Sequence, residues 1–181
     1  MNGLHGLNPV NPGTDQRTTM NVRFPAEVAS VLTKAGWFPG RRMLPRAEQW
    51  ADILAGHTSP EGHRHAVFPA AVEAWAEFGG ITVTLEGAGR EQARTAFTID
   101  PLFGLHQPRT LADLGRCLEL PLAPLGQERD GQALLAIDAL GRVHSLDHSG
   151  EWFLGQTMDQ ALATLVAGTT PDRLRFVADT M

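Results

Sequence analysis

Several residue types are scarce in this sequence, and each scarcity excludes a class of protein. Cys117 is the only cysteine among 181 residues, which excludes an internal disulfide framework and the cysteine-rich zinc motifs. No apolar run approaches the roughly 18–20 residues of a membrane-spanning helix, and residues 1–20 lack the basic and apolar regions of a signal peptide. We therefore expect a cytoplasmic protein that does not contact membranes.

Positive charge is scarce as well. Fifteen Lys and Arg residues stand against 20 Asp and Glu residues, which leaves a net charge of −5. Neutralising phosphates requires clustered basic residues, so we expect no direct binding to nucleic acid. Lys34 is the only lysine and tyrosine is absent. The codon bias of a GC-rich genome explains this better than arginines specialised for carboxylate or phosphate recognition, because the arginines are scattered.

Length and composition predict one globular domain. The chain is 43% hydrophobic and 19% charged, as folded proteins are, and it is long enough to bury a core without a disulfide or a metal. Residues 1–21 are rich in Gly, Pro, Asn and Thr and have no periodicity, so we expect a flexible tail in which Met20 is a second candidate for the natural start. We expect a single domain over residues 22–170 and a polar tail over residues 171–181.

The pattern of apolar residues predicts both helices and strands. Thr110 and Thr157 are the expected N-caps of the last two helices, and Gln160 completes a capping box with Thr157. The predicted helices cover residues 25–35, 46–55, 69–78, 110–118 and 157–167. Alternation of apolar and polar residues predicts strands over residues 81–85, 93–100, 133–138, 142–146 and 152–155.

The order of these elements predicts an α+β fold. Pro121 and Pro124 indicate an extended passage before the third strand, and Gly141 ends a tight connection between the third and fourth. Helices come first, hairpin-connected strands follow, and one helix closes the domain, which differs from the alternation of a doubly wound parallel sheet. We expect a central antiparallel-rich sheet of about five strands, flanked by N-terminal helices and a C-terminal helix.

No set of residues predicts catalysis. The chain contains no nucleophile elbow, no phosphate-binding loop and no H-E-x-x-H, and its acidic residues are dispersed. Cys117 lies between leucines in the predicted short helix and is expected to be buried and inert. We therefore expect no enzyme, no catalytic residue and no cofactor.

A metal site is the strongest chemical alternative. His57, His63 and His65 lie within nine residues and include Glu61 between them, a set that suits zinc or nickel. The segment also contains Gly and Pro, and a loop of this kind supplies neither a rigid frame nor a second shell. We expect a solvated loop and no metal ligand, while a metal-binding enzyme built on these histidines remains an alternative.

Short motifs occur along the chain in a characteristic order. They are A-G-W-x-P-G-R at 35–41, F-G-G at 78–80, F-x-x-D-P at 97–101, P-L-G at 124–126 and G-R-V at 141–143. Together they resemble the third subfamily of the SUKH immunity-protein superfamily, which is related to fungal cell-wall assembly regulators. The resemblance covers about residues 24–170. One departure is His144, which stands where family members often have tyrosine.

The resemblance implies a function as well as a fold. It implies an α+β domain that acts in the bacterial cytoplasm as an antidote, binding a cognate polymorphic toxin, often a nuclease or a nucleic-acid deaminase, and blocking it. A net acidic chain without a catalytic set agrees with this role. The alternative is a general protein-interaction or scaffold module without a toxin partner. The oligomeric state stays open.

The motif residues are expected to build the scaffold, and other residues to contact the partner. Arg41 and Arg142 are expected to pair with Glu77 or Asp138, and Trp50 and Trp75 to lie in the core. Loop positions with acidic or aromatic character are the partner-binding candidates, and these are Trp37, Glu61, Asp147, Glu151 and Trp152. Alanine at both Asp147 and Glu151 is expected to weaken toxin binding without lowering the melting temperature.

Overall fold

A computed structural model describes residues 23–176, so the predicted N-terminal tail lies outside the described residues. The helices are α1 (Ala26–Lys34), α2 (Leu44–Gly56), α3 (Pro69–Phe78), α4 (Pro108–Leu118) and α5 (Met158–Ala167), with short 3-10 helices η1 (Pro101–Gly104) and η2 (Arg129–Gly131). The strands are β1 (Thr82–Val83), β2 (Phe97–Thr98), β3 (Leu122–Glu128), β4 (Ala133–Asp138), β5 (Val143–Asp147), β6 (Gly150–Gly155) and β7 (Asp172–Arg173).

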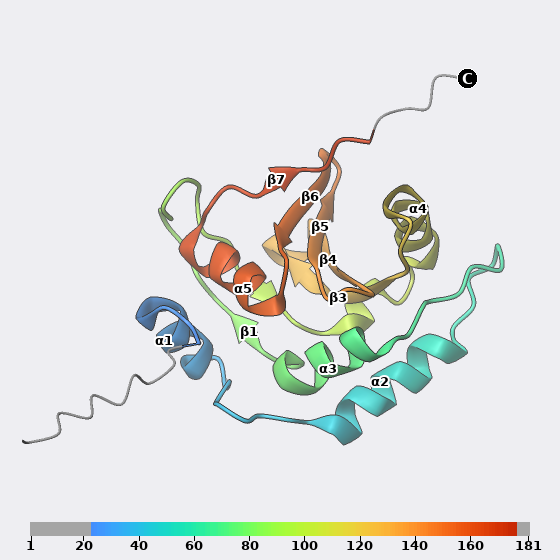
Figure 1. Ribbon diagram of the computed structural model, residues 1–181, viewed down its shortest axis with the longest axis horizontal. Coiled ribbons are helices and arrows are strands. Elements are labelled where there is room, and N and C mark those ends of the chain that lie inside the picture. Colours follow the sequence, from blue (N-terminus) through green and yellow to red (C-terminus); the bar gives the residue numbers. More distant parts are fainter. Residues whose placement is uncertain (1–22, 177–181) are drawn as a thin grey trace, which may run out of the picture.

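The strands form one antiparallel sheet in the order β1-β2-β3-β4-β5-β6-β7. Helices α1, α3 and α5 pack on one face of this sheet and α4 on the other, while α2 lies outside α3 (Figure 1). The predicted α+β class is confirmed. Residues 23–176 contain seven strands instead of about five, because β3 and β7 join the five predicted strands.

Strand β3 was missed because Pro124 within it and Pro121 just before it disfavour a strand. The register of β3 against β4 shifts between Pro124 and Gly126, so the missing proline N–H falls at a bulge. The Pro124 carbonyl accepts a hydrogen bond from Trp75 Nε1 at 3.0 Å. Gly126 lets the neighbouring strand approach, because a Cβ there would lie 2.0 Å from the Thr98 carbonyl oxygen. Two residues of the predicted C-terminal tail form β7, which pairs with β6.

The helix boundaries follow the predicted signals except at the starts of α2 and α4. Helix α2 begins at Leu44, two residues before the predicted start. Gly168 caps α5 with φ of +64°, and the Thr157 hydroxyl accepts the Gln160 N–H at 3.2 Å, as the capping box predicted. The prediction that Thr110 caps α4 was wrong. Gln107 occupies the N-cap position, because Pro108 suits the first helical position and starts the helix two residues earlier.

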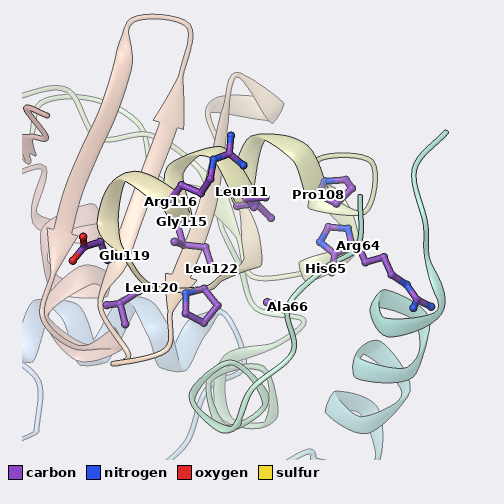
Figure 2. Close-up of a pocket in the computed structure, with 12 residues that line it drawn as sticks. Arg64, His65, Ala66, Pro108, Leu111, Gly115, Arg116, Glu119, Leu120 and Leu122 are labelled. Carbon is purple, nitrogen blue, oxygen red and sulfur yellow. The ribbon is translucent and has the colours of Figure 1, made fainter. Parts of the chain in front are cut away.

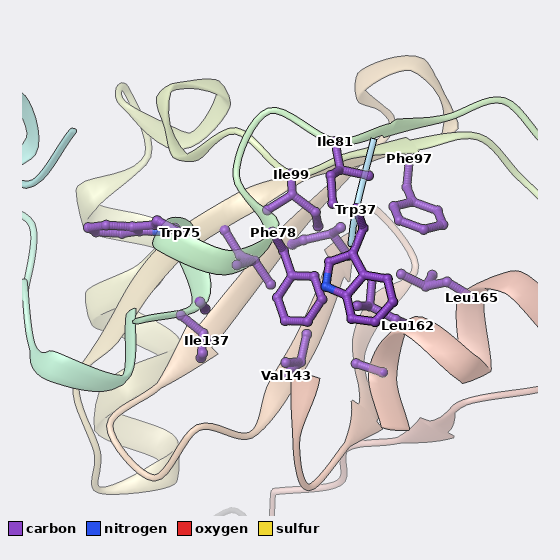
Figure 3. Packing of buried hydrophobic residues seen from close by; sticks show 14 of the residues in the cluster. Trp37, Trp75, Phe78, Ile81, Phe97, Ile99, Ile137, Val143, Leu162 and Leu165 are labelled. Carbon is purple, nitrogen blue, oxygen red and sulfur yellow. The ribbon is translucent and has the colours of Figure 1, made fainter. Parts of the chain in front are cut away.

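The main core lies between the sheet and the helices of one face (Figure 3). Trp50 and Trp75 are 2% and 0% exposed, which confirms the prediction that they belong to the core. A second, smaller cluster lies under α4 on the opposite face and contains Leu111, Leu114, Leu122, Ala136 and Leu146. Both faces of the central strands are therefore buried.

Candidate interaction surface

Trp37, the first predicted partner-binding residue, lies in the main core. It is only 5% exposed, its ring meets Phe24 edge-on with 5.1 Å between centroids, and its Nε1–H donates to a Glu77 carboxylate oxygen at 3.2 Å. Figure 3 shows the indole beside side chains of α5. Gly36, with φ of +98°, reverses the chain after α1 and turns the ring inward. The loop position of Trp37 suggested an exposed ring, and this expectation was wrong.

Asp147 stabilises the β5–β6 hairpin. Its side chain is 4% exposed, and its carboxylate accepts the Ser149 N–H at 2.7 Å and pairs with Arg129 at 3.1 Å. Burial opposes ionisation, but hydrogen bonds from the Ser149 hydroxyl and N–H, together with the Arg129 charge, keep the pKa of Asp147 below its usual range. Its loss would therefore affect the hairpin as well as any partner contact.

Glu151 and Trp152 point to opposite faces of the sheet. They are successive residues of β6, and successive side chains of a strand alternate between faces. Glu151 pairs with Leu146, which belongs to the cluster under α4, whereas Trp152 pairs with Ser145 on the α5 side. The Arg173 guanidinium of β7 lies 5.7 Å from the Trp152 ring centroid. No single flat partner surface includes both residues.

Glu61 is the one fully exposed member of the five candidates. It lies in the loop between α2 and α3, where its carboxylate accepts a hydrogen bond from the Ser59 hydroxyl at 3.0 Å. An isolated bridge between Thr58 and Arg64 closes this loop. The loop and the β5–β6 hairpin are separate parts of the molecule (Figure 1). The five candidates thus do not come together in one site.

The histidines gather in a different combination from the one predicted. The His57 ring is tilted against His65 and meets His106 edge-on, with ring centroids 5.9 and 5.2 Å apart. His106 of the η1–α4 connection therefore takes the place expected for His63. His65 Nε2 donates to the Leu105 carbonyl at 2.7 Å, and burial lowers the pKa of His65. Within residues 23–176, no group of three or more possible ligands could hold a metal ion.

Arg142 of the G-R-V motif and the buried Asp138 stabilise the turn between β4 and β5. The Asp138 side chain is fully buried, pairs with Arg142 at 2.6 Å and accepts the backbone N–H groups of Leu140 and Arg142 at 3.0 Å each. The predicted pairing of Arg142 is confirmed. Arg41 instead donates to two backbone carbonyls, those of Glu77 and Gly79, so its predicted pairing with a carboxylate was wrong.

An apolar groove lies beside α4, in a region for which sequence reasoning supplied no partner-binding candidate. This α4 groove, of about 310 Å³, runs between α4 and the segment 64–66 and is lined by Arg64, His65, Ala66, Pro108, Leu111, Ala112, Gly115, Arg116, Glu119, Leu120, Pro121 and Leu122 (Figure 2). The apolar residues of α4 recur at helical spacing, and from sequence alone such a stripe is predicted to face a core. Cys117, on the same helix, is exposed, so the predicted burial of its thiol was wrong.

Comparison with protein families gives a match over most of the described residues. The family model of the SUKH-3 immunity protein matches residues 24–168. The chain belongs to the SUKH-3 immunity protein family. No curated protein and no solved structure matches it.

The SUKH-3 match coincides with the structural framework. It begins at Phe24, just before α1, and ends at Gly168, the left-handed cap of α5, so β7 lies beyond it. The motif residues inside the match form turns and buried pairs, as Asp138 and Arg142 illustrate. The SUKH-3 motifs therefore specify the scaffold, and the surface that meets a toxin must be found from the geometry. In the part that the structure describes, no helix is both long enough and apolar enough to cross a membrane.

Proposed function

We propose that this SUKH-3 immunity protein binds a cognate toxin protein and neutralises it by covering the surface with which the toxin meets its substrate. One observation carries the proposal: the family match extends over residues 24–168, nearly all of the described fold. An immunity protein implies a toxin partner, and it acts through binding rather than catalysis. Its place of action is the bacterial cytoplasm.

The charge of the chain supports a toxin that acts on nucleic acid. A nuclease or a nucleic-acid deaminase presents basic surface to phosphates, and a net charge of −5 complements such a surface. Opposite net charges accelerate association, and salt screens this acceleration. The association rate is therefore expected to fall as ionic strength rises, and a rate that is independent of salt would contradict this class of toxin.

The decisive experiment joins binding to protection. The tagged chain is used to capture partners from extracts of its source cells, with the tag alone as control. Bound proteins are identified and quantified by mass spectrometry. We expect one partner at close to equal stoichiometry, whose isolated toxic domain arrests growth on expression and does so no longer when this chain is co-expressed. Several substoichiometric partners without toxicity would instead establish the scaffold alternative, and no partner at all would overturn the toxin-binding function.

A further inference from the structure

The two edges of the sheet differ in their protection against pairing with another strand. Around β7 the chain carries Pro171, Asp172, Arg173 and Arg175, and prolines and charges of this kind block edge-to-edge pairing. Around β1 the sequence Ile81-Thr82-Val83-Thr84-Leu85 contains no charge and no proline, and it is rich in residues that favour strands. The β1 edge thus lacks the protection that the β7 edge has.

The ladder between β1 and β2 fixes which backbone groups of this edge point outward. The Ile99 N–H donates to the Ile81 carbonyl at 2.9 Å, and Thr82 pairs with Thr98 in the next register position. Hydrogen-bonded and non-hydrogen-bonded pairs alternate in an antiparallel ladder. The N–H and C=O groups of Thr82 therefore point away from β2. If the same alternation continues one residue past the end of β1 at Val83, those of Thr84 point away as well.

A groove accompanies these outward-facing groups. It has a volume of about 270 Å³ and lies between Val31, Lys34 and Ala35 of α1 and residues 82–85. Figure 1 shows α1 next to β1. Thr82 and Thr84 are exposed, whereas Val83 is 2% exposed and holds the strand to the core. We call the outward backbone groups of residues 82–85 and the adjacent wall of α1 the β1-edge groove.

We propose that the β1-edge groove binds an extended segment of the toxin, which adds an eighth strand to the sheet. The unpaired N–H and C=O groups select an extended chain, because only a strand presents donors and acceptors at the matching spacing. Alternate apolar side chains of that segment pack against Val31 and Ala35, and an acidic side chain pairs with Lys34. The proposal rests on the proposed function, since the segment belongs to the toxin.

The α4 groove is larger, but its chemistry selects no single occupant. Its walls are mainly apolar side chains, with Arg64 and Arg116 of one sign and Glu119 of the other. The β1-edge groove differs because backbone groups specify the conformation of what binds.

The test removes one outward N–H and leaves the remaining surface in place. Proline fits an edge position whose N–H points to solvent, so Thr84→Pro is expected to fold with a melting temperature close to that of the wild type. Thr84→Val is the matched control, because it removes the same hydroxyl but keeps the N–H. Each variant is titrated by calorimetry with the captured toxin domain in a catalytically inactive form. We expect Thr84→Pro to weaken binding by about tenfold or more, the scale of a lost backbone hydrogen bond plus a clashing ring, and Thr84→Val to bind as the wild type does.

A second measurement uses the unmodified chain. Hydrogen exchange of the Thr82 and Thr84 amides is expected to slow in the complex, as it does when an amide enters a ladder. If Thr84→Pro binds like Thr84→Val, or if these amides exchange equally fast in the free and bound protein, the groove does not bind the toxin. In either case the captured toxin still binds and is still neutralised, so the function stands. A chain that captures no toxin removes both the function and this inference.

Discussion

His144 Nε2 lies 3.0 Å from a carboxylate oxygen of Asp138, and neither side chain is more than 1% exposed. A carboxylate only accepts, so the imidazole donates through its Nε2–H. Burial lowers the pKa of His144 more than the Asp138 charge raises it, and the ring is therefore neutral at neutral pH. Burial opposes the ionisation of Asp138 too, but hydrogen bonds from His144 and Arg142 hold its pKa below the usual range. The pair thus combines a neutral imidazole with an ionised carboxylate.

Substituting His144 should change how stability depends on pH. The unfolded chain protonates this histidine near its ordinary pKa of about 6.5, whereas the folded chain does so only at lower pH. The contribution of His144 to stability is therefore complete above about pH 6.5, the pKa of the unfolded chain. It falls as the pH decreases below that value, by at most about 1.4 kcal/mol per pH unit for one proton. His144→Gln replaces the imidazole with a non-titrating amide that can still donate a hydrogen bond to Asp138. Urea denaturation between about pH 7 and about pH 5 should give a steeper loss for the wild type than for the variant. Equal slopes would show that His144 is not buried in its neutral form.

Removing the charge of Asp138 should destabilise the fold. Asp138→Asn keeps an acceptor for the turn amides but leaves the Arg142 guanidinium without its buried partner, at a cost of about 3–5 kcal/mol in unfolding free energy. Glu73→Gln is the control, because the Arg42–Glu73 pair is exposed on both sides and should contribute little. Chemical denaturation measures the unfolding free energy of both variants. Similar losses of unfolding free energy for the two variants would show that the buried Asp138–Arg142 pair contributes no more to stability than an exposed pair does.

Two glycines should respond to alanine for different reasons. At Gly126 a Cβ would lie 2.0 Å from the Thr98 carbonyl oxygen, so Gly126→Ala must push β2 and β3 apart and should prevent stable folding. At Gly141 nothing lies within 4 Å, but φ is +84°, and the strain of an L-residue there is about 1–2 kcal/mol. Thermal melts of both variants compare the two effects. A Gly126→Ala protein as stable as Gly141→Ala would contradict the close approach of the strands.

The two carboxylates of the β5–β6 hairpin, Asp147 and Glu151, should respond differently to substitution. Asp147→Ala removes the acceptor of the Ser149 N–H and the partner of Arg129, and should lower the unfolding free energy by about 1–3 kcal/mol. Glu151→Ala should leave the melting temperature unchanged. The double variant is therefore expected to be destabilised, contrary to the expectation from sequence, and only Glu151 tests partner binding cleanly. A melting temperature that Asp147→Ala does not alter would return Asp147 to the candidate surface.

Local signals in the sequence sufficed for most of the fold. The third helix and strand β4 were predicted with their observed bounds, since Pro69 starts the helix and alternating residues define the strand. Strand β3 was out of reach, because Pro124 is acceptable only where a bulge removes the need for its N–H and where Trp75 binds its carbonyl. Both conditions come from residues distant in the sequence.

The candidate site was less accessible to sequence reasoning. Loop position suggested that Trp37 is exposed, but the reversal at Gly36 returns the ring to the core. Loop position also suggested that Asp147 is free, although it closes its own hairpin. Neither the α4 groove nor the β1-edge groove has a motif, because each arises where elements from separate parts of the chain meet. Only the three-dimensional arrangement reveals such surfaces.

The sequential strand order has a consequence for how the chain acquires its structure. Every pairing joins strands that follow one another along the chain, so no strand has to find a partner across an intervening strand. The β3–β6 meander needs only short turns and is expected to form first. Pairing of β2 with β3 must close the longer connection over residues 99–121, which includes α4, so β2 and then β1 are expected to dock later. The open edge at β1 should thus be the last part of the sheet to close and the first to exchange its amide hydrogens.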